Sequence, residues 1–89
     1  MKRSMLDILA CPMDKKYPLE LLEIVSDGQE VQDGALYCPP CGRFYPIIDG
    51  IPMLFPDHLR DRTKDLDFLA QRRGKLPDKI IKQGSPWHL

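Results

Sequence analysis

The sequence contains no hydrophobic run that could cross a membrane and no segment laid out as a signal peptide. Its longest apolar stretch near the start, residues 5–11, is interrupted by Asp7, whereas a membrane-spanning helix needs roughly 20 apolar residues. With 89 residues, the chain is long enough for one small globular unit. These absences predict a cytoplasmic protein that does not associate with a membrane.

Cysteine and histidine are scarce. Three cysteines, an odd number, do not fit a disulfide framework, and cytoplasmic thiols stay reduced. Neither of the two histidines has ligand spacing to a cysteine. The sequence also lacks a glycine-rich nucleotide loop and a nucleophile–base pair at a recognisable spacing. We therefore predict a protein that is not an enzyme.

An excess of charge of either sign is also missing, since 13 basic and 13 acidic residues give a net charge of zero. The charge is unevenly placed, because residues 60–89 carry eight Lys/Arg against four Asp. These basic residues are Arg60, Arg62, Lys64, Arg72, Arg73, Lys75, Lys79 and Lys82. A solvated helix surface is the simpler interpretation. The alternative is a nucleic-acid-binding protein that uses the basic 60–82 segment.

Short β-compatible runs alternate with turn signals through the first two thirds of the chain. Asp-Gly, a strong hairpin signal, occurs at 27–28, 33–34 and 49–50. The expected strands cover residues 17–25, 29–32, 35–37, 43–48 and 51–55. The first of them should be a strand with a bulge, because its apolar alternation slips phase, although a helix starting at Pro18 is the alternative. The pattern predicts an antiparallel meander.

Helical signals flank these strands. Residues 5–9 should form one or two helical turns, with Ser4 as the N-cap. After Asp57, apolar residues recur at helical spacing, at Leu59, Leu66, Leu69 and Ala70. A second short helix should start at Pro77, because proline suits the first helical turn.

Two motifs with the same spacing indicate a metal site. The motif at 38–41, C-P-P-C, is followed by Gly42, and glycine tolerates the unusual dihedral of a knuckle turn. The motif at 11–14, C-P-M-D, repeats this spacing with a carboxylate in place of the second thiol. Zn²⁺ accepts both ligand types, and four of them close its coordination shell. We predict a structural zinc held by Cys11, Asp14, Cys38 and Cys41.

Other interpretations of these motifs stay open at the level of sequence. The 38–41 motif superficially resembles a thioredoxin-type redox pair, although a strand-like run follows it instead of a helix. Iron bound as in rubredoxin needs a fourth thiolate, which Asp14 does not provide. Asp14 can also be a surface carboxylate, with a different fourth ligand, a water or no metal at the site.

The order of the motifs is more specific than any one of them. A leucine-rich turn precedes Cys-Pro at 11–12, the second knuckle leads into Tyr-Pro-Ile at 45–47, and Asp-Gly-Ile-Pro follows at 49–52. Residues 4–56 therefore resemble the small zinc-ribbon methyltransferase-activator family of the "Trm one-twelve" type. Asp14 departs from the family pattern, which has a second cysteine there. The family's eukaryotic helical insertion is missing, which points to a prokaryotic, archaeal, member.

The resemblance implies a function. Members are non-catalytic subunits that bind, stabilise and activate S-adenosylmethionine-dependent methyltransferases acting on tRNA, rRNA or a translation release factor. It implies a heterodimer with such an enzyme, and contact with RNA only through the complex. The expected fold class is α+β: a zinc-ribbon-like antiparallel meander with a short N-terminal helix over residues 1–56, followed by a charged helical C-terminal extension over residues 57–89.

The predicted hairpin over residues 43–55, around Asp49-Gly50, carries more apolar residues than one inner face of a small sheet can bury. Surplus apolar surface and free strand edges are typical of partner sites. The residues expected to contact a partner are Ile47, Ile48, Ile51, Pro52, Met53, Leu54 and Phe55. The alternative is that the C-terminal helix covers this hairpin within the chain.

Overall fold

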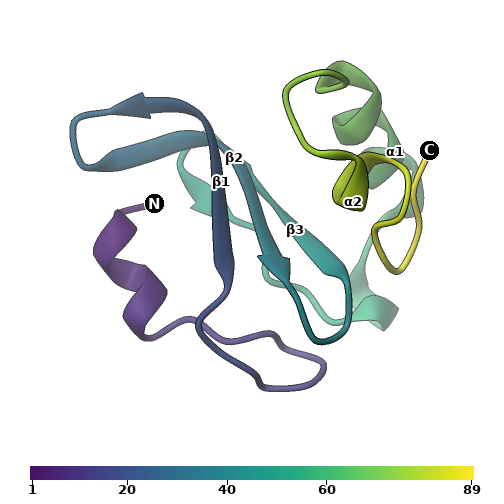
Figure 1. Cartoon of the computed structure of the whole chain (residues 1–89), viewed down its shortest axis with the longest axis horizontal. Coiled ribbons are helices and arrows are strands. Elements are labelled where there is room, and N and C mark those ends of the chain that lie inside the picture. The colour runs from purple at the N-terminus through teal and green to yellow at the C-terminus, as the bar shows by residue number, and fades with distance from the viewer.

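The computed structural model describes all 89 residues and contains one four-stranded antiparallel sheet, in the order β1-β2-β3-β4 (Figure 1). The strands are β1 (Glu20–Asp27), β2 (Glu30–Cys38), β3 (Arg43–Ile48) and β4 (Ile51–Pro52). The helical segments are η1 (Arg3–Asp7), η2 (Asp57–Leu59), α1 (Arg62–Gln71) and α2 (Asp78–Ile81). The predicted α+β class is confirmed. None of these helices is long and apolar enough to span a bilayer.

Two of the three Asp-Gly pairs lie at hairpins, as predicted. At the first, Asp27 ends β1 and the turn to β2 is formed by Gly28 and Gln29. The pair at 49–50 is itself the turn from β3 to β4, with φ of 51° at Asp49 and 78° at Gly50, as a type I′ turn requires. The turn predicted at 33–34 is wrong, because Gly34 lies inside β2. A Cβ at Gly34 would lie 2.3 Å from the carbonyl oxygen of Leu22. Glycine is needed there because β1 approaches closely, so 29–32 and 35–37 belong to one strand.

The ends of several elements differ from the sequence prediction. The bulge in β1 is present, between Glu23 and Val25. Ser4 is not an N-cap, because η1 is a 3₁₀ turn that begins at Arg3 and has no side-chain cap. Leu59 is not part of the long helix and is 62% exposed, because α1 begins only after Asp61 caps it.

The sheet separates two hydrophobic cores, since successive side chains of a strand point to opposite faces. The metal-side core contains Leu36, Tyr45 and Ile47 of the sheet, and its fully or nearly fully buried members also include Met1, Cys11, Leu19, Val31 and Cys38. The helix-side core joins Ala35 and Phe44 to the C-terminal helices through Phe68, Leu69, Leu76, Ile80 and Ile81. Figure 1 shows the N-terminal segment on one side of the sheet and α1 and α2 on the other.

Ion pairs also hold the C-terminal segment on the sheet. Arg72 donates to both carboxylate oxygens of Asp33, at 2.8 and 3.2 Å, and Lys79 binds both oxygens of Glu20 at 2.8 Å. The positive charge of the C-terminal third is thus partly neutralised by carboxylates of the sheet.

Candidate metal centre

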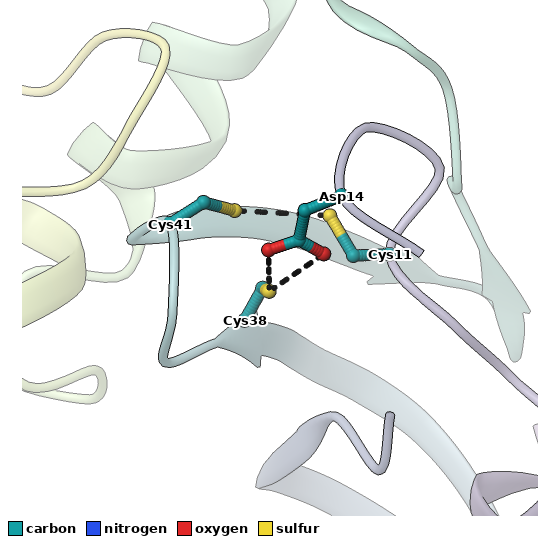
Figure 2. A group of neighbouring side chains, drawn as sticks. All are labelled: Cys11, Asp14, Cys38 and Cys41. Atoms are coloured by element: carbon teal, nitrogen blue, oxygen red, sulfur yellow. Dashed lines mark hydrogen bonds between the residues drawn. The ribbon is translucent and has the colours of Figure 1, made fainter. Parts of the chain in front are cut away.

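Two separate turns bring the four predicted ligands together. Cys11 and Asp14 lie on the turn between η1 and β1, Cys38 ends β2, and Cys41 lies in the turn that leads to β3. Their four ligand atoms lie within 4.8 Å of one another. Figure 2 shows the three sulfurs and the carboxylate pointing toward one another. The sequence spacing therefore identified one real cluster.

The backbone of the two turns is nearly the same. In each, the N–H of the fifth residue donates to the carbonyl of the first cysteine at 2.8 Å: Lys15 to Cys11 and Gly42 to Cys38. The fifth residue has a positive φ in both, 61° at Lys15 and 74° at Gly42. The predicted role of Gly42 is confirmed, and the first turn makes the same knuckle although lysine must adopt a conformation that favours glycine.

The distances fit a tetrahedral ion. With Zn–S of about 2.3 Å, two sulfurs on one tetrahedral zinc lie about 3.8 Å apart. The sulfurs of Cys11 and Cys41 are 3.7 Å apart. The sulfur of Cys38 lies 3.3 and 3.5 Å from the two carboxylate oxygens of Asp14. Three soft thiols and one carboxylate match the ligand preferences of zinc, so these residues fit the predicted metal.

The electrostatics of the cluster favour a cation. The N–H of Lys16 donates to Asp14 at 2.9 Å and holds the pKa of that carboxyl below its usual range, so Asp14 is charged. Burial raises the pKa of the Cys38 thiol. A divalent ion at the centre would offset that cost, because a bound cation stabilises the thiolate form of a coordinating cysteine.

Tyr45 belongs to this site and was not identified from the sequence as part of it. Its side chain is fully buried, and its hydroxyl lies 2.9 Å from the sulfur of Cys11. Burial raises the pKa of Tyr45, so the hydroxyl keeps its proton and can donate to a Cys11 thiolate. Such outer hydrogen bonds orient metal ligands. Only the alternation of β3, which places Tyr45 on the metal-side face, could have indicated it.

The thioredoxin-type alternative does not fit the fold. A redox pair of that type lies at the start of a helix, whereas β3 follows Cys41 here. All three cysteines are free thiols. The arrangement is a ligand cluster between two loops, typical of a structural metal site.

A sequence model of the family described as "Trm112p-like protein" matches residues 2–50, which is more than half of this chain. The chain belongs to the Trm112p-like family. The resemblance seen in the motif order is thereby confirmed.

Two curated relatives of this Trm112p-like chain are proteins named UPF0434. The one from Teredinibacter turnerae is 39% identical over 61 residues, which covers 68% of this chain and 81% of the relative. The one from Stutzerimonas stutzeri is 39% identical over 67 residues, which covers 75% of this chain and 92% of the relative. The archaeal source stays a prediction.

A solved structure is also similar. It is the complex between the Haloferax volcanii Trm112 methyltransferase activator and the putative methyltransferase, and the matching chain is 47% identical with a TM-score of 0.64. The match covers 100% of that chain but 67% of this one. About a third of this Trm112p-like chain therefore has no counterpart in that chain.

The residues expected to contact a partner differ in how far they are exposed in the structure. Ile48, Ile51 and Phe55 are exposed, at 37%, 57% and 48%. Pro52, Met53 and Leu54 are half-buried. The prediction that Ile47 contacts a partner is wrong. The alternation of β3 points its side chain to the same face as Tyr45, and Ile47 is fully buried in the metal-side core. Ile51 pairs with Ile48 across the β3–β4 hairpin, and Ile48 and Phe55 line the same groove. We call these three exposed residues the hairpin surface (Ile48, Ile51 and Phe55).

Proposed function

We propose that this chain is a non-catalytic subunit that binds, stabilises and activates a cytoplasmic S-adenosylmethionine-dependent methyltransferase as a heterodimer. The observation that carries the proposal is the 47% identity to the whole of a chain from a complex of a methyltransferase activator with a putative methyltransferase. Residues 1–56 are the activator core in this account, and residues 57–89 are an extension added to it.

The hairpin surface supports a partner at this position. Ile48, Ile51 and Phe55 leave apolar area in water, and such area at a free strand edge favours association. The sheet has β4 as one terminal strand, with two residues, so a strand of a partner could pair with it. The C-terminal segment packs on the sheet mainly through Ala35 and Phe44, and it leaves Ile48, Ile51 and Phe55 exposed.

We propose a structural role for zinc. Cys11, Asp14, Cys38 and Cys41 would hold the ion, which would link the loop before β1 to the turn before β3. A four-ligand shell of this kind leaves no open position for an activated water. Its contribution is to stabilise the fold that presents the hairpin surface.

The substrate of the complex belongs to the translation machinery in this proposal: tRNA, rRNA or a release factor. RNA would be contacted only through the complex. The alternative, direct nucleic-acid binding by residues 60–82, has less support. Arg72 and Lys79 are engaged by carboxylates of the sheet, and the side chain of Arg60 is 2% exposed.

The experiment is a pull-down of the tagged chain from its native host, with mass spectrometry of the proteins that co-purify. We expect one or more methyltransferases at near-equal stoichiometry, stable at high salt. Ile51→Asp should abolish this capture, because it places a charge in the hairpin surface. Val25→Asp is the matched control, since Val25 is similarly exposed, at 51%, on the opposite edge of the sheet. Recovery of RNA alone, lost at high salt, would favour the nucleic-acid alternative.

A further inference from the structure

A groove of about 410 Å³ lies beside the hairpin surface, where the β3–β4 hairpin meets the C-terminal segment. Half of its lining residues are hydrophobic, and these include Ile48 and Phe55 from the hairpin and Phe68 from α1. Its polar residues come from the chain just after the hairpin. The groove is therefore built jointly by the family core and by the extension.

Arg60 is one of the residues that line this groove, and two of its buried donors have no acceptor. Its side chain is 2% exposed, and its Nε donates to Asp65 at 2.9 Å. Both of its Nη atoms are buried without a hydrogen-bond partner. The guanidinium carbon lies 4.8 Å from the ring centre of Phe44 and 5.2 Å from that of Tyr45. Cation–π contacts offset part of the free-energy cost of burying the charge, but buried donors without an acceptor still destabilise the fold.

The charges of the groove determine what kind of ligand it fits. Its two carboxylates are already engaged: Asp61 caps α1, and Asp65 accepts from Arg60 and from Trp87 at 3.0 Å. The ammonium group of Lys64 is exposed and forms no ion pair. The buried polar atoms without a hydrogen-bond partner are both donors, the two Nη atoms of Arg60. A complementary ligand carries an acceptor, and a carboxylate matches the paired Nη atoms best.

We propose that this groove binds a segment of the partner methyltransferase that carries an apolar side chain next to an Asp or Glu. The apolar side chain packs against Phe55 and Phe68. The carboxylate accepts from Arg60, whose guanidinium turns from the aromatic rings toward the groove, and from Lys64. This inference rests on the proposed function, since the groove continues the hairpin surface.

The same placement assigns the extension a role in the choice of partner. Arg60, Lys64 and Phe68 lie beyond the family match, which ends at residue 50. The hairpin surface is apolar and can accept many partners. The donors of the groove add a requirement for an acid at one position, and a partner without it leaves Arg60 unsatisfied, which is how buried polar groups create specificity.

The test measures the affinity of the heterodimer with the methyltransferase that the wild-type chain captures. Arg60→Met keeps the length of the side chain but removes the donors, and Lys64→Glu reverses an exposed charge. Each should weaken binding roughly 10- to 100-fold, the range for a hydrogen bond to a charged group. Lys75→Glu is the control, because Lys75 is also exposed but lies outside the groove, and it should bind like wild type.

Carbodiimide cross-linking of the complex adds a readout that does not depend on the folding of a variant. It joins an amine directly to a carboxylate in contact with it, so Lys64 should be linked to an Asp or Glu of the enzyme. If Arg60→Met and Lys64→Glu bind the enzyme as tightly as the wild-type chain while Ile51→Asp binds more weakly, the groove proposal is wrong and the proposed function still holds. Failure of the wild-type chain to capture any methyltransferase would overturn both proposals.

Discussion

Replacement of Asp14 by alanine tests the ligand set of the candidate metal centre. The carboxylate of Asp14 lies 3.3 Å from the sulfur of Cys38 and completes a cluster of four ligand atoms. Loss of an outer-shell partner of a metal ligand already weakens metal binding by roughly 10- to 100-fold. Loss of a ligand should therefore weaken zinc binding by about 100-fold or more. The melting temperature of the zinc-loaded protein should fall in parallel, since metal binding and folding are coupled.

Two further variants make the Asp14 prediction specific. Asp14→Cys should retain zinc, because the second turn already holds Cys41 in the same knuckle geometry. Asp7→Ala is the control, because it removes an exposed carboxylate outside the cluster. Competition with a chromogenic chelator gives the affinity, and elemental analysis gives the stoichiometry. If Asp14→Ala binds zinc as tightly as the wild-type chain, Asp14 is not a ligand.

Two other residues give independent predictions. Tyr45→Phe removes the hydroxyl that lies 2.9 Å from the sulfur of Cys11. The variant should bind zinc roughly 10-fold more weakly, with little change in its circular dichroism spectrum. Unchanged zinc affinity would show that this hydrogen bond does not support Cys11 as a ligand. Asp57→Asn should lower the free energy of unfolding by up to about 1 kcal/mol near pH 7, because Asp57 accepts two charge-assisted bonds from Arg43 that hold its pKa below the usual range. Since that pKa is lowered on folding, the stabilisation is complete above about pH 4 and is lost as the pH falls further, so urea titrations of the two proteins should converge in acid; a constant difference would contradict the assignment.

The features that sequence predicted well are set by neighbouring residues. The two C-x-x-C-like motifs identified the ligand cluster because each knuckle is a local turn. Asp-Gly at 49–50 identified the β3–β4 hairpin for the same reason. Pro77 likewise identified the start of α2. Lys15 shows where local prediction fails. Its positive φ of 61° is imposed by the knuckle turn, because lysine by itself does not favour this conformation.

The features that sequence missed depend on contacts between distant parts of the chain. Asp-Gly at 33–34 is not a turn, because the glycine accommodates the carbonyl of Leu22 on a neighbouring strand. Ile47 is buried because the N-terminal segment covers that face of β3. The unpartnered guanidinium of Arg60 arises from packing over two aromatic rings. Local patterns alone do not specify these contacts: the alternation of β3 separates its two faces, but it does not show which face the N-terminal segment covers.

The most direct test of the account is the activity of the captured methyltransferase with and without this chain. The enzyme is purified alone and titrated with the zinc-loaded chain, and transfer of the methyl group from S-adenosylmethionine to the host's tRNA, rRNA and release factors is measured. We predict that activity rises with added chain and reaches a plateau at one equivalent, and that Ile51→Asp gives no rise. Full activity of the enzyme alone, unchanged by the chain, would contradict it.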